Sequence, residues 1–265
     1  MTLKSLSLAL ATTALVALNL PVLAEDAKGP NVGTTAAGTV AGAAATMTLA
    51  QDLYALGVAQ GDALTVLAAA KLAASVAAEA GADPAALELS PEDFAALSPR
   101  KSGGAPPVRA LSSDAVISKA TSAPDDGSDD GAADGPVTAD QMFAKATELA
   151  GDDDMLIGLI EDAQAEGSRG RIGGAVEWLS RLPAGQTDVW EIPFYGNSYA
   201  EIAVAGDGDA DLDVAVTDEN GNVICYDVSY SDRVYCDWTP SWDGYFYVTV
   251  QNMGGSRNSY YLLTN

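Results

Sequence analysis

The sequence has no histidine, which excludes several kinds of active site at once. A Ser-His-Asp triad, a Cys-His nucleophile and a His-based zinc site all need an imidazole side chain. A Ser-Lys dyad would need a lysine from helical or disordered segments that have no supporting sheet: Lys28, Lys71, Lys101, Lys119 or Lys145. Acidic residues are abundant, but nothing singles out two of them as a pair for glycoside hydrolysis. We therefore predict a protein that is not an enzyme, with an uncharacterised hydrolase as the less favoured alternative.

Basic residues are scarce, because 13 lysines and arginines stand against 37 aspartates and glutamates, for a net charge of −24. Such a chain repels nucleic acid and anionic membrane surfaces, so we expect no nucleic-acid partner. The charge favours cations or basic partners, or it serves solubility alone.

Long hydrophobic runs are missing except near the start, where residues 6–20 are almost wholly apolar. Lys4 precedes this run, and small residues favour a signal-peptidase cut after Ala24. A membrane anchor is the alternative, but the run is short for a span and no basic stop-transfer sequence follows it. We predict a signal peptide over residues 1–24 and a periplasmic or secreted mature protein without a stable membrane span.

Cysteine occurs only twice, as Cys225 and Cys236. The residues between them suggest two strands around a turn at 229–232, so the two cysteines should face each other across a hairpin. In an oxidising compartment this arrangement predicts a disulfide. Closing so short a loop contributes about 3 kcal/mol in the chain-entropy model.

The first half of the predicted mature chain alternates between featureless and helical segments. Residues 25–45 have no periodicity and predict a disordered lead. Residues 46–81 carry leucines at helical spacing and Asp62 as a candidate N-cap, which predicts two antiparallel helices. Residues 82–137 are rich in Pro, Gly and Asp and predict a disordered linker.

A second helical pair is predicted over residues 138–167. Thr138 and Gln141 form a capping box at its start, and Gly151 suits the end of its first helix. We expect the two pairs to pack into a small unit of about four helices. The glycine-rich, basic residues 168–180 predict a hinge to the next part of the chain.

Aromatic residues are few, and 14 of the 18 lie in residues 181–265. This segment contains short strand-like runs separated by turn residues: 187–195, 199–205, 211–217, 222–228, 233–238, 244–251 and 258–264. Short strands at such regular spacing predict an all-β, jelly-roll-like sandwich. The fold class is therefore α+β, with a helical unit before the sandwich.

Two of these runs alternate clearly between apolar and polar residues. In 211–217, Leu212, Val214 and Val216 share one side, and the Asp218–Gly221 segment that follows predicts a hairpin turn. In 244–251, the same alternation turns one side to the core and leaves Tyr245 and Tyr247 facing outward.

The acidic loop before residue 212 suggests a calcium site. Its candidate ligands have carboxylate or amide oxygens: Asp207, Asp209, Asp211, Asp213, Asp218 and Asn220. Alternate residues of a strand share a face, so Asp211 and Asp213 should point together, and uncompensated acids this close would repel. Ordinary solvation of an exposed strand is the alternative. No other cofactor is predicted.

Several of these stretches together resemble a known family. They are Trp190–Phe194, Ala203–Asp213, Asp218–Gly221 and Trp242–Val250. They resemble the bacterial pre-peptidase C-terminal domain, and the resemblance covers about residues 181–265. It implies a jelly-roll-like sandwich that serves as a non-catalytic accessory module for binding, secretion or stability, sometimes with calcium. The sequence departs from the usual setting of that family because no peptidase domain precedes this segment.

We expect an exported protein whose sandwich binds a protein or glycan at the cell envelope or outside the cell. The contacts would come from exposed aromatics among Tyr226, Tyr230, Tyr235, Trp238, Trp242, Tyr245 and Tyr247, although core packing is expected for about half of them. The alternative is a structural or assembly role for the helical unit, with the sandwich as a stability or secretion module. Deleting residues 181–265 should distinguish the two.

Overall fold

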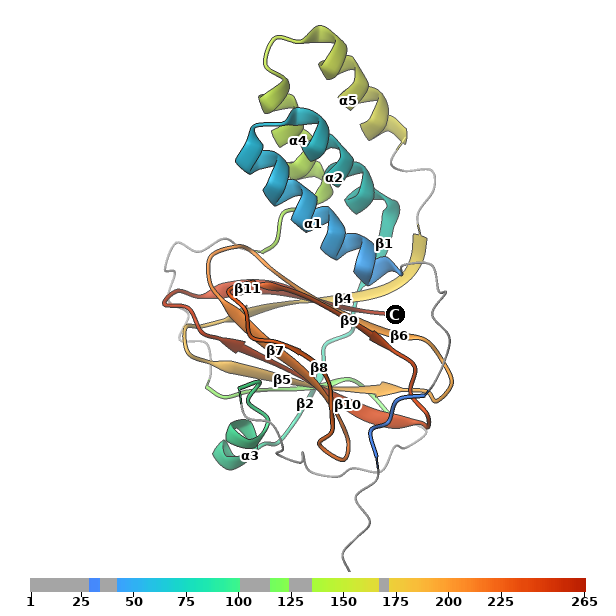
Figure 1. Ribbon diagram of the computed structural model, residues 1–265, viewed down its shortest axis with the longest axis vertical. Coiled ribbons are helices and arrows are strands. Elements are labelled where there is room, and N and C mark those ends of the chain that lie inside the picture. Colours follow the sequence, from blue (N-terminus) through green and yellow to red (C-terminus); the bar gives the residue numbers. More distant parts are fainter. Residues whose placement is uncertain (1–28, 34–41, 101–114, 124–134, 167–171) are drawn as a thin grey trace, which may run out of the picture.

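The computed structural model describes residues 29–33, 42–100, 115–123, 135–166 and 172–265. They form a helical unit that lies over the outer face of one sheet of a two-sheet β-sandwich (Figure 1). The predicted α+β class is confirmed. The predicted signal peptide and the cut after Ala24 lie outside the described residues.

Four helices make up the helical unit, and side-chain caps mark the beginnings of α2 and α4. They are α1 (Ala43–Gln60), α2 (Ala63–Ser75), α4 (Ala139–Ala150) and α5 (Asp154–Glu166). Asp62 accepts a hydrogen bond from the Leu64 backbone N–H at 3.0 Å, and Thr138 forms the predicted capping box with Gln141. Helix α1 ends at Gly61, whose positive φ of 65° suits glycine.

The core of the helical unit consists largely of alanine. Small side chains from α1 and α2 pack against larger ones from α4 and α5, and the buried set is Ala50, Val66, Leu67, Ala69, Ala70, Ala73, Met142, Phe143, Ala146, Ile160 and Ala163. The two predicted helical pairs therefore share one core.

All seven predicted strands are present in the sandwich. They are β5 (Thr187–Phe194), β6 (Ala200–Gly206), β7 (Leu212–Asp218), β8 (Val223–Asp227), β9 (Arg233–Trp238), β10 (Gly244–Asn252) and β11 (Asn258–Thr264). Antiparallel pairing of β7 with β8 confirms the predicted hairpin, and Gly221 in its turn has a positive φ of 78°. Leu212, Val214 and Val216 face the core as predicted.

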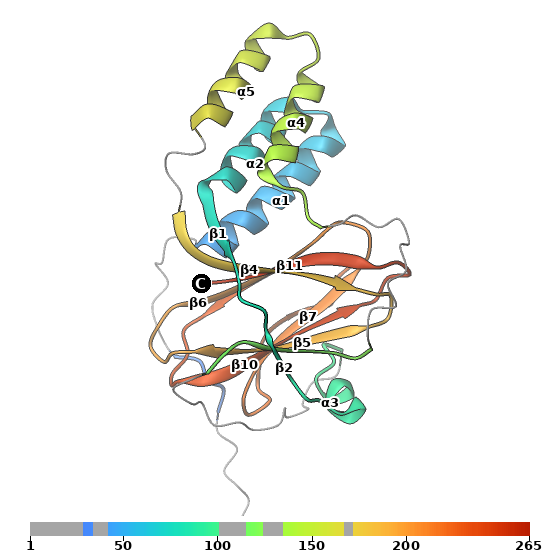
Figure 2. The ribbon, with the colours of Figure 1, turned by 180° about the vertical axis from the view of Figure 1, so that it is seen from behind.

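Four further strands come from segments in which the sequence predicted no strand. They are β1 (Val76–Ala80), β2 (Ala85–Ala86), β3 (Ser118–Thr121) and β4 (Ile172–Leu182). One sheet has the strand order β1-β4-β11-β6-β9 and the other the order β2-β3-β5-β10-β7-β8. Figure 2 shows β1 running from α2 down beside β4.

These strands were not predicted because they form by pairing with strands that are distant in the sequence. Residues 76–80 were predicted as the end of a helix, but β1 pairs in parallel with β4. The predicted hinge, 168–180, contains most of β4, which hydrogen-bonds to both β1 and β11. Backbone N–H and C=O groups at a sheet edge gain hydrogen-bond partners in this way. This gain outweighs the weak local preference of an Ala-rich or Gly-rich segment for structure other than a strand.

Residues 82–137 also differ from the predicted disordered linker. Their described part contains β2, β3 and the short helix α3 (Pro91–Ala96). Tyr245 and Tyr247 do point away from the core between the sheets, but they are buried beneath this segment, against Leu87 and Leu97. A sheet face that carries two tyrosines and Val189 is apolar enough to need a cover.

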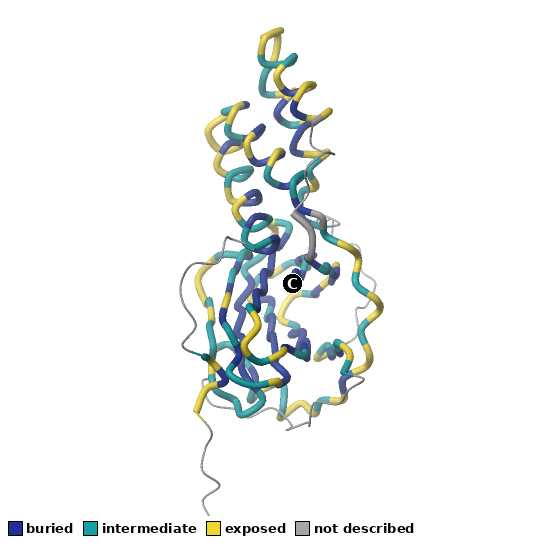
Figure 3. Tube along the Cα trace, turned by 90° about the vertical axis from the view of Figure 1, so that its right-hand side faces the viewer, coloured by how far each residue is buried: buried dark blue, intermediate teal, exposed yellow. Residues whose placement is uncertain are grey.

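The core between the two sheets contains most of the large apolar side chains. Figure 3 shows buried residues following the strands, while exposed residues concentrate on the helices and loops. Trp190, Phe246 and Leu262 are at most 1% exposed, and Phe194, Trp238 and Phe246 stack edge to face or at a tilt. None of the described helices is both long and apolar enough to cross a membrane.

Helix α1 docks on the five-stranded sheet through its first turn. The Glu201 carboxylate on β6 is 1% exposed and accepts a hydrogen bond from the Ala44 backbone N–H at 3.2 Å. A negative charge at a helix N-terminus is stabilising. A Cβ atom at Gly42 would lie 2.0 Å from Glu201 Oε1, so only glycine allows this approach. Arg233 on β9 adds an ion pair with Asp52 at 3.4 Å.

Candidate functional site

The acidic residues proposed for calcium do not act as one group in the structure. Asp213 is fully buried and is paired with Arg100, whose Nη2 atom donates to Asp213 Oδ1 at 3.1 Å. Asp207 accepts hydrogen bonds from the backbone N–H groups of Ser259, at 2.7 Å, and Asp209, at 3.2 Å. Among the described residues, no group of three or more acidic, Cys or His side chains is placed to hold a metal ion.

Asp218 and Asn220 belong to the turn between β7 and β8. The Asp218 carboxylate is fully buried and accepts from the backbone N–H groups of Asn220 and Asn222, at 2.9 and 2.8 Å. It also accepts from the backbone N–H of Asn31, at 2.8 Å. The structure therefore uses Asp218 to fix a turn and to hold residues 29–33, which the sequence placed in a disordered lead.

Asp211 is the acid of this loop with the fewest partners. Its Oδ1 atom is buried without a hydrogen bond. Burial raises the pKa of Asp211, the charge of Asp213 raises it further, and Arg100 opposes both effects. The pKa of Asp207 is also raised, mainly by burial. Calcium binding stays a prediction.

The predicted disulfide between Cys225 and Cys236 is present, but the two strands that carry the cysteines do not form the predicted hairpin. The sequence placed both cysteines in one hairpin, whereas β8 pairs with β7 and β9 pairs with β6. Because β8 and β9 are edge strands of opposite sheets, the disulfide links the two sheets along one open side of the sandwich.

Two exposed tyrosines lie in the segment that this disulfide closes, and we call them the aromatic corner. Tyr226 on β8 is 65% exposed, and Tyr230 in the loop between β8 and β9 is 97% exposed. Of the other aromatics expected at the surface, Trp238, Tyr245 and Tyr247 are buried, as the core-packing alternative predicted. Tyr195, 71% exposed, lies between β5 and β6 and was not singled out by the sequence.

A lysine and a serine meet inside the sandwich, contrary to the prediction that no lysine has a supporting sheet. Lys119 on β3 donates to Ser180 on β4 at 2.6 Å and lies 3.0 Å from the buried Asp188 carboxylate. Ser180 itself donates to Asp188 at 2.7 Å. A dyad needs a neutral lysine as base, but a carboxylate at this distance stabilises the charged ammonium. This cluster is a buried ion pair.

The same carboxylate organises further side chains. Tyr260 and Thr121 donate to Asp188 at 2.6 and 2.5 Å, and Trp190 donates to the Tyr260 hydroxyl at 2.8 Å. Burial, followed by the charge of Asp188, holds the pKa of Tyr260 well above its ordinary value. Ser180, Tyr260, Thr121 and Lys119 are directed at Asp188, and Trp190 is directed at Tyr260, so these donors are satisfied within the cluster.

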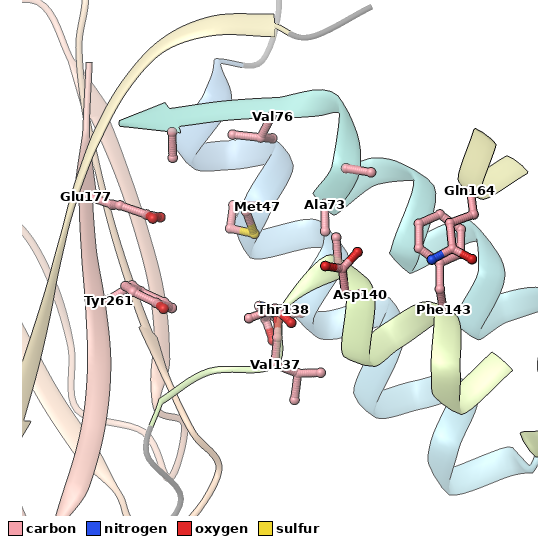
Figure 4. A pocket seen from close by; sticks show the side chains of 14 residues that line it. Met47, Ala73, Val76, Val137, Thr138, Asp140, Phe143, Gln164, Glu177 and Tyr261 are labelled. Carbon is pink, nitrogen blue, oxygen red and sulfur yellow. Dashed lines mark hydrogen bonds between the residues drawn. The ribbon is translucent and has the colours of Figure 1, made fainter. Parts of the chain in front are cut away.

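A cleft of about 410 Å³ separates the helical unit from the five-stranded sheet. Figure 4 shows Glu177 from β4 and Tyr261 from β11 pointing across it toward the helices. Met47 and Phe143 line the helical side, and Asp140 of α4 brings a second carboxylate. The sequence analysis identified none of these residues, because α1, α4, β4 and β11 are far apart along the chain.

Burial shapes the electrostatics of this cleft. It raises the pKa of the Glu177 carboxyl, and it raises the pKa of the Tyr261 phenol, to which the charge of Glu177 also contributes. None of the fourteen described residues that line the cleft is a lysine or an arginine. The cleft is therefore a partly desolvated space with negative charge on both walls.

Comparison with known proteins adds little to this description. No family model matches the chain, and no curated protein matches it. Among solved structures, the pre-peptidase C-terminal domain of a collagenase from Bacillus anthracis is similar to part of it, with a TM-score of 0.30 and 17% identity over 34% of this chain and 87% of that one. A likeness of this size does not establish the family, so the resemblance stays a prediction.

Proposed function

We propose that this chain is an exported, non-catalytic binding protein whose sandwich contacts a glycan or a protein through the aromatic corner. One observation carries the proposal: Tyr230 and Tyr226 leave most of their surface in water, at 97% and 65% exposure. Tyrosine is enriched in binding surfaces because it offers a large, stiff contact area with a polar tip.

The disulfide supports a binding role for this corner. Cys225 immediately precedes Tyr226, and the bond to Cys236 fixes both ends of the segment that carries Tyr230. A surface held in one conformation loses less entropy on binding than a flexible loop. A disulfide also persists in the oxidising compartments where an exported protein works.

The absence of catalysis is part of the proposal. The chain has no histidine, and Lys119 and Ser180 are both engaged with Asp188. Ser180 is 4% exposed and lies between the sheets, where a substrate carbonyl has no access. A Ser180→Ala variant should therefore bind partners as the parent does.

The test uses the double variant Tyr226→Ala with Tyr230→Ala and the control Tyr195→Ala. Tyr195 is also well exposed, on a different loop of the sandwich. Cosedimentation with murein sacculi, chitin and cellulose measures glycan binding, and cross-linking to envelope proteins measures protein binding. We expect the double variant to lose affinity about thirtyfold or more, since a single aromatic anchor is worth about 2 kcal/mol or more. Equal binding by the parent and the double variant would contradict the proposal.

The alternative, an assembly role for the helical unit, is supported by a different observation. The helices expose several large apolar side chains: Leu49, Leu56, Val58, Leu64, Met155 and Leu159, the most exposed being Met155 at 85%. The double variant Leu56→Lys with Leu64→Lys should then fail to bind the partner protein. If the Tyr226 and Tyr230 double variant still binds that partner fully, the assembly role is favoured.

A further inference from the structure

The cleft between the helical unit and the sandwich plays no part in the function proposed for the aromatic corner, and it has the features of a separate small-molecule site. Its volume of about 410 Å³ falls within the range of small-molecule sites, roughly 300–1,000 Å³. The walls come from both bodies of the protein, with Met47 and Val137 on the helical side and Tyr261 on the sheet. Apolar walls with a few polar groups are typical of such sites.

Two of the polar side chains that line the cleft are carboxylates. Glu177 extends from β4 into the cleft, and Asp140 lies across from it in the first turn of α4. The lining amide of Gln51 donates to the Val137 carbonyl at 2.8 Å, so its N–H group is engaged away from Glu177. Without a basic residue among the described lining residues, the wall carboxylates meet no cation of the protein itself.

We propose that this cleft binds an organic cation, an ammonium compound with an attached apolar group. The ammonium would lie against Glu177, with Asp140 and the ring of Tyr261 nearby, and the apolar group would contact Met47, Val137 and Phe143. A charged hydrogen bond in a partly desolvated site is stronger than one in water. The face of a tyrosine ring also attracts cations.

A bare metal ion fits this cleft less well than an organic cation. Hard metal ions take six or more oxygen ligands, and the described lining residues of the cleft include two carboxylates, on opposite walls. An organic cation uses the apolar walls as well. The raised pKa of Glu177 agrees with this proposal, because burial without a counter-charge disfavours the carboxylate and a bound cation would relieve that cost.

The test uses the full mature chain, isothermal titration calorimetry and two probes of nearly equal shape. The first is 2-phenylethylamine, which is cationic at pH 7.5, and the second is the neutral hydrocarbon 1-phenylpropane. We expect the amine to bind about tenfold or more tightly than the hydrocarbon, because only the amine forms charge-assisted hydrogen bonds. Equal affinities, or no binding of the amine, would overturn the proposal.

Two variants and a matched control locate the site. Glu177→Gln keeps the shape and removes the charge, and we expect about a tenfold loss of amine affinity. Asp140→Asn should give a smaller loss. Glu79→Gln removes the same charge from β1, next to the cleft-lining Ala78, but Glu79 is exposed and does not line the cleft. The Glu79→Gln variant should bind the amine with the same affinity as the parent.

The proposal fails if Glu177→Gln, shown by circular dichroism to be folded, binds the amine as the parent does. It also fails if Glu79→Gln loses as much affinity as Glu177→Gln, because the effect would then reflect net charge alone. The titratable groups of the cleft are Glu177, Asp140 and Tyr261. Amine binding should weaken as pH falls through the raised pKa of Glu177. This site is independent of the aromatic corner, so either proposal can fail without the other.

Discussion

Lys119 supplies the positive charge at the buried Asp188 carboxylate. Asp188 is fully buried, while the lysine side chain keeps 20% of its surface exposed and packs over the Trp190 ring, 5.0 Å from its centroid. Three hydroxyl groups, of Ser180, Tyr260 and Thr121, satisfy the other acceptor positions of the carboxylate. The cluster thus ties β3 and β5 of one sheet to β4 and β11 of the other.

Replacing Lys119 with methionine should destabilise the protein strongly. The change keeps most of the side-chain volume but leaves a buried charge without its partner, which costs about 3–5 kcal/mol. Urea denaturation measures the free energy of unfolding. Lys145→Met is the control, because Lys145 pairs with the exposed Glu148 on one helix, where ion pairs contribute little. Equal stability of the two variants would contradict this assignment.

The sequence could not reveal this cluster, although it contained every residue. Lys119 lies in a stretch rich in Ser, Ala and Asp, and only its pairing with β5 brings it beside Asp188. Asp218 shows the same limit. Its place in a turn was predictable from Asp218–Gly221, but its bond to Asn31 spans 187 residues. Local patterns predict local partners, and these contacts are long-range.

At the scale of single elements, prediction worked where alternation and turns were clear. The seven strands between Thr187 and Thr264 and the four helices are all confirmed, because each carries its own periodicity or cap. β4 was missed because its first three residues, Ile172-Gly-Gly174, have no strand pattern of their own. β1 was missed because an Ala-rich segment favours a helix until a sheet edge offers partners.

The disulfide closes the side of the sandwich on which β8 and β9 form the edges. Replacing Cys225 and Cys236 with serine should lower the free energy of unfolding by about 3 kcal/mol, because the unfolded chain regains the freedom of an 11-residue loop. Thermal melting with and without a reducing agent checks this. The parent should shift on reduction and the double variant should not. A parent that melts unchanged under reduction would show that the bond contributes nothing.

The segment over β10 acts as a cover rather than a linker. Leu97 is 3% exposed and packs with Leu87 against Tyr245 and Tyr247. Leu97→Ala should cost about 2–4 kcal/mol, the usual cost of truncating a buried leucine. Leu49→Ala, at a 50% exposed position of α1, is the control and should change little. Urea denaturation compares the free energies of unfolding of the two variants. If Leu97→Ala is as stable as Leu49→Ala, this segment is a linker and not a cover.

At the scale of the whole molecule, the chain passes several times between the helices and the sandwich. α1 and α2 lead into β1, and α4 and α5 lie between β3 and β4 in the sequence. A fragment of residues 181–265 therefore lacks β1, β3 and most of β4, including the core residue Trp178. We expect this fragment to melt without a cooperative transition, whereas residues 42–265 should melt cooperatively. A cooperative 181–265 fragment would show that the sandwich needs none of these strands.

Calcium binding is best tested on the whole protein, because the candidate acidic ligands are spread over a loop and a turn. The calcium hypothesis predicts a higher melting temperature in millimolar calcium than in EDTA, with no such rise in magnesium. Asp211→Asn should abolish the rise, since Asp213 is already paired with Arg100. An unchanged melting temperature would contradict calcium binding, and the acidic residues of the loop would then serve solvation alone.

The order of strands in the five-stranded sheet has a consequence for the timing of folding. β11, residues Asn258–Thr264, is the last strand of this sequence, yet it occupies the centre of the order β1-β4-β11-β6-β9. Until it has been synthesised, β4 and β6 have no strand between them, and their open edges are exposed to pairing with other chains. Such non-local pairing is slow. The protein can therefore complete this sheet only after residues 258–264 have been made.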